Sequence, residues 1–457
     1  MIRFIFWRVI VLAVSGLAVG AELQSPAPAQ NSEPIAAIAA GTRTDANAAW
    51  WGFNAEDSTE ALQSAIDSGA KTITVPYVGA PWIVRPIKLR SNLELLFEPG
   101  VLVLAKKGEF KGKGDSLFSA EDMTDITVRG YGATLRMHKK DYQSADYEKA
   151  EWRMGFAFDG CKRVLVEGVR VESSGGDGFY IGATAENRWC EDVTLRNCVC
   201  VDHHRQGLSV ISAQNLLVEN CVFSGTSGTA PQAGIDLEPN APEERLVNCH
   251  FRNCTMENNA GSGILVYLKP LRSTSEPVSI RFENCVVRMG SVGMTMADYT
   301  NVDMEGSSGV TVAAVRDDGP QGLIEFVNCT TENTAEESLA LSEKSAKAAR
   351  VRFENCRFGE SWVAAVREYS GVRASIMLMG RRPDVAVDLG GVEFADCHVY
   401  GTEDRPAIAY VPGSEDTGLR EVSGTLTVHS PVRPEGLDGQ QVPNLTSISL
   451  EIVTAGK

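Results

Sequence analysis

The chain has 457 residues and a formal net charge of −16, from 43 lysines and arginines against 59 aspartates and glutamates. Phosphate binding needs a basic surface, so this composition argues against nucleic acid as a partner. It disfavours a polyanionic sugar only weakly, because one basic groove can lie on an acidic protein. The length exceeds that of a usual compact core, which leaves two domains or one elongated repeat domain.

The first residues predict export. Arg3 and Arg8 precede an apolar run over 9–19, which is shorter than the roughly 20 residues of a membrane span. We therefore expect a signal peptide at 1–20 and a secreted or periplasmic protein that leaves the membrane after cleavage, with a retained N-terminal anchor as the alternative. Residues 21–48, rich in Ala, Pro, Ser and Gln, are expected to form a disordered linker.

The stretch after the linker predicts a helix. Residues 57–60, Asp-Ser-Thr-Glu, offer a polar cap and an acidic first turn, which favour a helix N-terminus. An apolar stripe follows at Ala61, Leu62, Ala65 and Ile66. Such a helix could cover the open end of a solenoid, where strand edges would otherwise be exposed.

A short motif that ends in Asn-Cys or Asp-Cys then recurs. Apolar and polar residues alternate within it, as in a strand with one buried face. Asn tolerates the left-handed conformation needed to turn a corner, so each copy predicts one coil of a solenoid with internal Asn and Cys ladders. The copies are Val193–Cys198, Leu217–Cys221, His250–Cys254, Ile280–Cys285, Ile324–Cys329, Val351–Cys356 and Val392–Cys397.

The chain has 11 cysteines. In an exported protein an odd number suggests disulfides with one cysteine left over. Their recurrence inside the repeat instead favours buried, reduced thiols that act as small hydrophobic residues. One or two bridges between stacked coils remain open, because neighbouring strands lie within disulfide range.

The repeat resembles the pectate-lyase-like superfamily of right-handed parallel β-helices, which includes the polygalacturonases and polysaccharide lyases. The resemblance covers Trp51 to Tyr400. It implies an all-β, single-stranded right-handed parallel β-helix with an N-terminal capping helix over residues 49–400. We expect residues 401–457 to form a final coil or a small β cap. The resemblance also implies a polysaccharide or oligosaccharide substrate.

Glycines at 178, 207, 234 and 263 align four of the coils. Residues two and four places after each glycine are expected to point outward, because side chains alternate along a strand. Those positions and the adjoining turns gather acids, bases and aromatic residues over three coils. The candidate site residues are Asp177, Tyr180, Asp202, His203, His204, Arg205, Gln206, Asp236, Glu238, Tyr267 and Lys269.

Asp236 and Glu238 predict acid–base chemistry. They lie two residues apart on one strand face, and glycosidases use two carboxyl groups about 5–9.5 Å apart. Repulsion between two close carboxylates would raise one pKa, as a general acid requires. Asp177 precedes an aligned glycine, where polygalacturonases carry the acid of an Asn-Thr-Asp-Gly run. The other acids and the histidine of that machinery are missing here, so Asp177 is only a supporting carboxylate or a turn residue.

The run Asp202-His203-His204-Arg205 indicates a second chemistry. A histidine or Tyr267 could remove a proton next to a uronate carboxylate, which Arg205 would bind with help from Lys269. Alginate epimerases of the same fold carry an Asp-Pro-His run that this sequence matches only loosely. The histidines could equally be polar turn residues.

Our leading hypothesis is a glycoside hydrolase with Asp236 and Glu238 as acid and base, Asp177 in support, and His203 and His204 beside them. The substrate would contact a wider group of side chains. A polysaccharide lyase or C5-epimerase and a non-catalytic carbohydrate-binding or adhesion protein are the alternatives. No spaced ligand set predicts a metal, although calcium remains an open alternative. The expected substrate-binding residues are Tyr180, Asp202, Arg205, Gln206, Tyr267 and Lys269.

Overall fold

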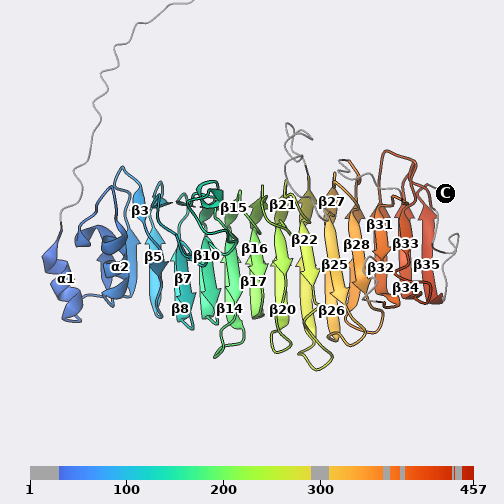
Figure 1. The fold of residues 1–457 in the computed structure, drawn as a ribbon, viewed down its shortest axis with the longest axis horizontal. Helices are drawn as coiled ribbons and strands as arrows, with labels where there is room; N and C mark the ends of the chain where they lie inside the picture. Colours follow the sequence, from blue (N-terminus) through green and yellow to red (C-terminus); the bar gives the residue numbers. More distant parts are fainter. Residues whose placement is uncertain are drawn as a thin grey trace, which may run out of the picture.

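The molecule is a long solenoid of parallel strands (Figure 1). The computed structural model describes residues 30–289, 308–363, 371–380, 386–434, 437 and 445–456. The all-β class and the repeat are confirmed. The expected signal peptide lies outside the described residues. In the part described, no helix is long and apolar enough to cross a membrane.

The strands form three parallel rows, of which one is an eleven-stranded sheet. Each strand in it pairs with its counterparts one coil earlier and one coil later. Its members are β4 (Ile87–Lys88), β7 (Phe118–Glu121), β10 (Phe156–Asp159), β13 (Phe179–Gly182), β16 (Leu208–Val210), β19 (Ile235–Leu237), β22 (Ile264–Tyr267), β25 (Val310–Val315), β28 (Leu339–Lys344), β31 (Ile376–Met379) and β33 (Ile408–Val411).

The other two rows join into a 24-stranded sheet through β32, which pairs with both β29 and β30. The first row comprises β1 (Asp45–Asn47), β2 (Thr72–Val75), β5 (Leu93–Phe97), β8 (Thr124–Arg129), β11 (Lys162–Glu167), β14 (Cys190–Arg196), β17 (Ala213–Glu219), β20 (Leu246–Arg252), β23 (Val278–Glu283), β26 (Gly322–Val327), β29 (Arg350–Glu354), β32 (Leu389–Val399), β34 (Leu419–Val428) and β35 (Thr446–Thr454). The second row comprises β3 (Trp82–Val84), β6 (Leu102–Ala105), β9 (Thr134–Arg136), β12 (Arg170–Glu172), β15 (Val199–Val201), β18 (Val222–Ser224), β21 (Thr255–Glu257), β24 (Val286–Arg288), β27 (Thr330–Glu332) and β30 (Arg357–Phe358). Because β34 and β35 continue the ladder, residues after 401 extend the solenoid.

The predicted linker at 21–48 is wrong where the structure describes it. Helix α1 (Ser32–Ala39) and strand β1 lie within this range. Alanine favours a helix, and Ile38 is buried in the core, so packing offsets the entropy of ordering this segment.

Helix α2 (Thr59–Asp67) follows a short 3₁₀ helix, η1 (Ala48–Trp51), and both lie at the same end as α1 (Figure 1). The carboxylate of Asp57 accepts hydrogen bonds from the amide and the hydroxyl of Thr59. The apolar stripe that the sequence predicted is buried. These contacts hold α2 against the first coils.

Asparagine turns the corner after each motif strand, as predicted. Asn197, Asn220, Asn253, Asn284 and two equivalents have φ near +55° or slightly below, including +54° at Asn197 and +51° at Asn355. Their side-chain amides bond to one another from coil to coil at 2.8–3.2 Å. The ladder lies on the outer surface, however, so the predicted internal position is wrong. The left-handed turn directs the asparagine outward and the next residue, cysteine, inward.

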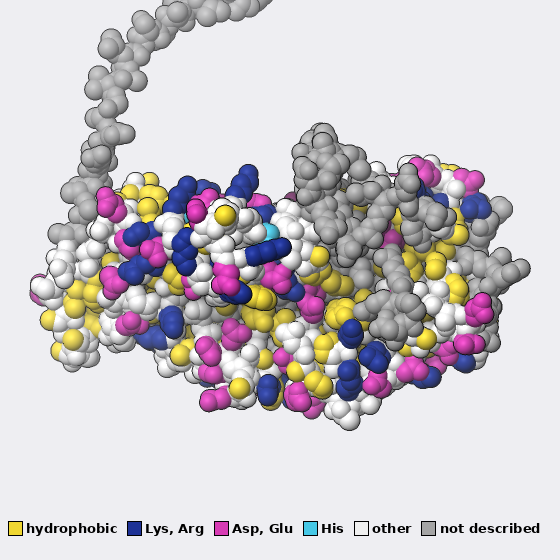
Figure 2. Space-filling model, in the orientation of Figure 1, with side chains coloured by type: hydrophobic (Ala, Val, Ile, Leu, Met, Phe, Trp, Pro, Cys, Tyr) yellow, Lys and Arg dark blue, Asp and Glu magenta, His cyan; other side chains and the backbone are white. Residues whose placement is uncertain are grey.

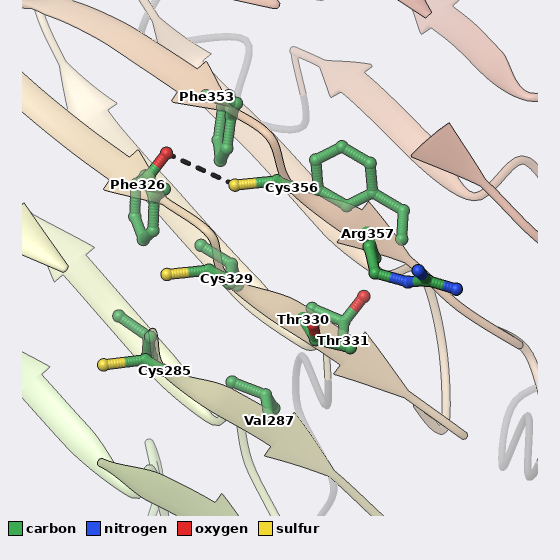
Figure 3. Close-up of a pocket in the computed structure, with 12 residues that line it drawn as sticks. Cys285, Val287, Phe326, Cys329, Thr330, Thr331, Phe353, Cys356 and Arg357 are labelled. Carbon is green, nitrogen blue, oxygen red and sulfur yellow. Dashed lines mark hydrogen bonds between the residues drawn. The ribbon is translucent and has the colours of Figure 1, made fainter. Parts of the chain in front are cut away.

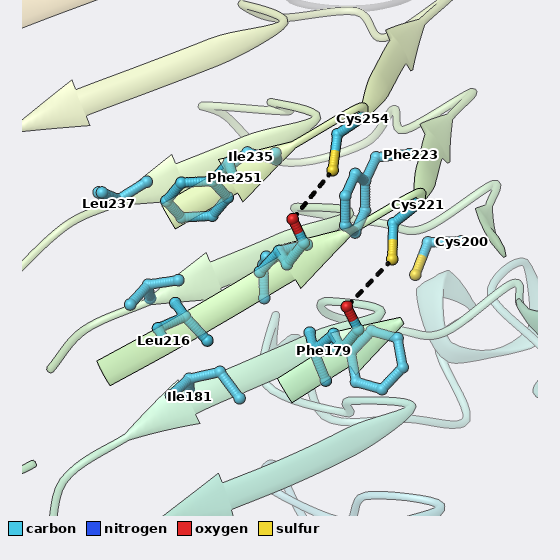
Figure 4. Packing of buried hydrophobic residues seen from close by; sticks show 14 of the residues in the cluster. Phe179, Ile181, Cys200, Leu216, Cys221, Phe223, Ile235, Leu237, Phe251 and Cys254 are labelled. Carbon is cyan, nitrogen blue, oxygen red and sulfur yellow. Dashed lines mark hydrogen bonds between the residues drawn. The ribbon is translucent and has the colours of Figure 1, made fainter. Parts of the chain in front are cut away.

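All 11 cysteines are buried free thiols. Those of the motif form a column in which each thiol donates to a backbone carbonyl of the preceding coil, as Cys356 does to Phe326 at 3.2 Å (Figure 3). Cys221 and Cys254 make the same contact farther along the core (Figure 4). A void of about 10 Å³ between Cys285, Phe326 and Phe353 is the size of one water at most. This part of the interior is therefore packed core, and a ligand must bind outside it.

Candidate active site

The aligned glycines bring the predicted site residues together on the outer face of the eleven-stranded sheet. A Cβ on Gly178 would lie 2.6 Å from the carbonyl oxygen of Gly207, and one on Gly207 would lie 2.5 Å from that of Gly234. The glycines therefore permit the close stacking of these coils. The register places Tyr180 beside Ser209 and Ser209 beside Asp236.

Arg205 is the centre of the cluster. Its Nη2 lies 2.8 Å from Oε2 of Glu238, its Nη1 3.8 Å from Oδ2 of Asp177, and its Nε 3.9 Å from Oε1 of Glu151. Asp177, Asp236 and Glu238 together raise the pKa of Arg205 above its usual value, although burial opposes this. One guanidinium group thus holds carboxylates from several coils in one place.

Asp236 and Glu238 differ sharply in exposure. Asp236 is completely buried, whereas the Glu238 side chain is 29% exposed. Burial is the largest cause that raises the pKa of Asp236 well above its usual range, and contact with the Glu238 carboxyl adds to it. Gln206 donates to Oδ2 of Asp236 at 2.7 Å, whereas Oδ1 accepts no hydrogen bond within the described residues. Asp236 and Glu238 therefore combine a buried carboxyl of raised pKa with a neighbouring carboxyl that is partly exposed.

Asp177 is completely buried as well. Burial raises its pKa to about 7, against the opposing effects of Arg205, the Ser209 hydroxyl and the Gln206 amide. Neither oxygen makes a hydrogen bond of normal geometry in the part of the chain described. Asp177 thus lies next to the Arg205 guanidinium, and no substrate can reach its buried carboxyl in this conformation.

Both histidines lie away from the surface. His203 is completely buried with Nδ1 2.7 Å from the Ser174 hydroxyl, and His204 is almost buried with Nε2 2.9 Å from the Thr229 hydroxyl. Burial lowers the pKa of His203 to about 3 and that of His204 to about 4, so both rings are neutral at physiological pH. Their contacts support packing of the turns.

Asp202 is engaged elsewhere. Its Oδ1 lies 2.7 Å from Nζ of Lys139 and its Oδ2 accepts from Ser173 at 2.8 Å. Lys139 also donates to Ser227 at 3.1 Å. Lys139 could not be predicted from the sequence, because it lies 63 residues before its partner and outside any repeated motif.

The aromatic candidates lie on either side of the cluster. Tyr180 is largely buried, and burial followed by Asp159 and Asp177 raises its pKa. Val266 pairs with Leu237, so Tyr267 and Lys269 lie one coil beyond Glu238. Both side chains are half-buried. These positions suit contacts with a ligand that extends along the sheet.

Sequence reasoning missed Glu151 and Trp152. They lie in the excursion between β9 and β10, which includes the 3₁₀ helix η2 (Asp141–Gln143) and carries no repeat signal. The Glu151 side chain is 29% exposed and Trp152 is 48% exposed. The dipeptide Glu151-Trp152 was the one signal in the sequence, and it is weak because such pairs are common.

Within the described residues no group of three or more His, Cys, Asp or Glu side chains is arranged to hold a metal ion. Basic and acidic side chains are interspersed over the N-terminal half of the face shown in Figure 2. The Arg205 cluster differs from that pattern because acids dominate it.

Comparisons with known proteins agree with this architecture. The family model described as the right handed beta helix region matches residues 145–308. The chain is a right-handed parallel β-helix. The β-helix is 27% identical over 220 residues to the SPbeta prophage-derived uncharacterized protein YorA of Bacillus subtilis, a match that covers 45% of this chain and 36% of that protein. The matches cover 36% and 32% of the lengths of the two curated relatives, so this chain spans about a third of each.

Two solved structures share the fold. A family 28 exopolygalacturonase of Yersinia enterocolitica has a TM-score of 0.59 at 12% identity, over 91% of this chain and 78% of that one. The mannuronan C-5 epimerase A-module AlgE6 of Azotobacter vinelandii has a TM-score of 0.59 at 15% identity, over 90% of this chain and 100% of that one. Both neighbours are carbohydrate-active, and at these identities the similarity establishes the fold alone.

Proposed function

We propose that this β-helix is a glycoside hydrolase that acts on a polysaccharide, with Asp236 and Glu238 as its acid–base pair. The observation that carries the proposal is the convergence of Asp177, Asp236 and Glu238 on Arg205. Hydrolysis of a glycosidic bond needs one carboxyl that keeps its proton and another group that accepts one. A buried carboxyl in contact with a second carboxyl meets the first requirement.

The proton resides on the buried member and leaves through the exposed one. Burial raises the pKa of Asp236 well above its usual range, which favours its protonated form, and Glu238 is the partly exposed member of the pair. In the reaction the proton of Asp236 passes through Glu238 to the glycosidic oxygen as the C1–O bond breaks, while the oxygen of a water molecule bonds to C1 and loses a proton to a base. Arg205 fixes the Glu238 carboxyl during this transfer, and Gln206 fixes that of Asp236.

The charge around the cluster favours an uncharged polysaccharide. Asp177, Glu151 and Glu238 all face Arg205, so the charge of this cation is matched by carboxylates of the protein. A uronate or sulfated sugar would therefore meet repulsion from the carboxylates around Arg205.

The same balance weighs against the lyase or epimerase alternative. That chemistry requires Arg205 to bind a substrate carboxylate, yet Glu238 occupies the guanidinium at 2.8 Å. It also requires a base in reach of the sugar, and both histidines are buried, which leaves Tyr267 as the one expected base that is partly exposed. A non-catalytic carbohydrate-binding role has no such obstacle, but it does not explain why the carboxyls of Asp236 and Glu238 lie together at the site.

The test is a screen of the purified protein against neutral, uronic and sulfated polysaccharides, with and without calcium. Reducing ends and the ultraviolet absorbance of unsaturated products are followed together. We expect reducing ends without absorbance, on neutral polymers, lost in Asp236→Asn and Glu238→Gln. Absorbance that survives those changes and is lost in Arg205→Ala would establish the lyase instead. Binding without turnover would favour the carbohydrate-binding role.

A further inference from the structure

The excursion between β9 and β10 is anchored to the coil that carries Asp177. Arg153 is completely buried, and it donates to the carbonyl oxygens of Phe110 at 2.8 Å and Glu148 at 3.0 Å. The sulfur of Met154 accepts from the amide of Asp177 at 3.0 Å. Glu151 is therefore held in place by contacts just after it in the chain.

The same segment packs closely on the turn that positions Arg205. A Cβ on Gly176 would lie 2.5 Å from the carbonyl oxygen of Glu151, so glycine is needed for this approach. The carbonyl of Gly176 in turn accepts from the amide of Arg205 at 3.1 Å. The backbones of Glu151 and Arg205 are thus positioned by one residue.

Glu151 and Glu238 lie around the same guanidinium group and are equally open, at 29% exposure each. Their distances to it, 3.9 and 2.8 Å, keep the two carboxylates within the upper limit of about 9.5 Å that inverting glycosidases use. Asp177 Oδ1 and Oδ2 and Asp236 Oδ1 are buried without a hydrogen-bond partner in the described residues, and Oδ2 of Asp177 lies 3.8 Å from Nη1 of the same guanidinium. Trp152, exposed beside Glu151, offers the apolar face on which a sugar ring can stack.

We propose that Glu151 is the second catalytic carboxylate of this site, acting as the general base opposite the Asp236–Glu238 pair. This inference rests on the proposed hydrolase function and assigns the base role to Glu151, so that Asp236 and Glu238 together serve as the acid. Asp177 cannot take the role in this conformation because it is completely buried.

Glu151 and the Asp236–Glu238 pair then divide one hydrolysis between them. Glu151 removes a proton from a water molecule, whose oxygen bonds to C1 of the sugar. The C1–O bond to the leaving sugar breaks, its electron pair stays on that oxygen, and the oxygen takes the proton from Glu238. The products are two hydroxyl-bearing sugars, and the proton on Glu151 returns to the acid pair through solvent.

The experiment compares Glu151→Gln with Glu148→Gln in the full chain, on whichever polymer the wild-type protein cleaves. Glu148 is an exposed acid of the same segment, paired with Lys113 at 2.8 Å, and serves as the matched control. We expect kcat to fall about 100-fold or more in Glu151→Gln, with KM little changed, and the control to retain activity. The acidic limb of the pH–rate profile, which reports protonation of the base, should disappear in the same variant.

A chemical rescue separates catalysis from positioning. In Glu151→Ala, sodium azide should restore bond cleavage and yield a glycosyl azide, because the anion needs no base to attack C1. Glu151→Gln with the turnover of Glu148→Gln, while Glu238→Gln is inactive, would overturn the inference and leave the hydrolase function intact. A wild-type protein that cleaves no polymer of the panel would overturn both together.

Discussion

Gln206 donates a hydrogen bond from Nε2 to Oδ2 of Asp236 at 2.7 Å, while its Oε1 accepts one from the amide of Ala233 at 2.7 Å. The side chain is completely buried. Both ends of one amide are therefore satisfied by the next coil, which fixes the orientation of Asp236.

Replacing Gln206 by Ala should destabilise the protein and alter the acid pair. Asp236 and the Ala233 amide would each lose a buried partner, at a cost of about 1–3 kcal/mol apiece. Loss of a hydrogen bond to the carboxylate should also raise the pKa of Asp236 further. Denaturant unfolding measures the first effect, with the exposed Gln143→Ala as control. Equal unfolding midpoints for the two variants would contradict the role assigned to Gln206.

Asp159→Asn should stabilise the protein at alkaline pH. Burial, together with Glu121 and Asp122, raises the pKa of Asp159 from 3.8 to about 7. The folded state therefore binds this proton more tightly than the unfolded state, and the associated stability is present below pH 3.8 and lost as pH rises to about 7. Melting temperatures should rise in the variant above pH 7 and change little near pH 4.

Asp125→Asn serves as the comparison of opposite sign. Arg163 and Thr124 lower the pKa of Asp125 to about 2, so its contribution to stability is present above the ordinary value of 3.8 and lost as pH falls toward 2. Melting temperatures of this variant should fall at neutral pH. The same pH dependence in both variants would contradict the assignment.

Gly176→Ala should impair the reaction without touching a charged group. The added methyl would lie 2.5 Å from the Glu151 carbonyl oxygen and 2.9 Å from the Arg153 amide, so the segment must move. We expect a fall in kcat of about tenfold or more, since small misplacements at active sites are costly. Gly114→Ala, where nothing lies within 4 Å, is the control. Full activity in Gly176→Ala would show that the segment does not position the site.

The 11 cysteines should be unreactive in the folded protein. All are buried free thiols, and reagents attack exposed thiolates. A thiol-titrating reagent should therefore label none in native buffer and all 11 in denaturant without reductant. Fewer thiols in denaturant would demonstrate disulfides between coils.

The repeat was predictable because each coil carries its own turn and core residues. Asparagine adopts positive φ more readily than most residues, and cysteine is apolar enough to be buried. The Asn-Cys step therefore located the corners of the coils without knowledge of the fold. The outward direction of the asparagine side chains was not predictable, because it depends on which side of the turn faces the neighbouring coil. Helix α1 was missed because composition alone cannot show that Ile38 finds a core to pack against.

The candidate site was predictable only where the repeat carried the register. Counting from the aligned glycines correctly brought Asp177, Arg205, Asp236 and Glu238 together. Burial of His203 was not evident, since a polar turn residue can lie inside or outside the stack. The position of Glu151 could not be predicted, because the segment between β9 and β10 has no repeat from which its alignment with neighbouring coils could be inferred.

The outer asparagine ladder makes coil length independent of coil spacing. Successive asparagines are separated by 23, 33, 31, 44 and 27 residues along the chain, yet every amide reaches its neighbour. Each coil therefore begins from the same reference point, whatever was inserted in the one before. Loops that wall a binding face can lengthen, shorten or be exchanged in evolution while the frame beneath them keeps its dimensions. For engineering, new ligand contacts are best grafted between these fixed points.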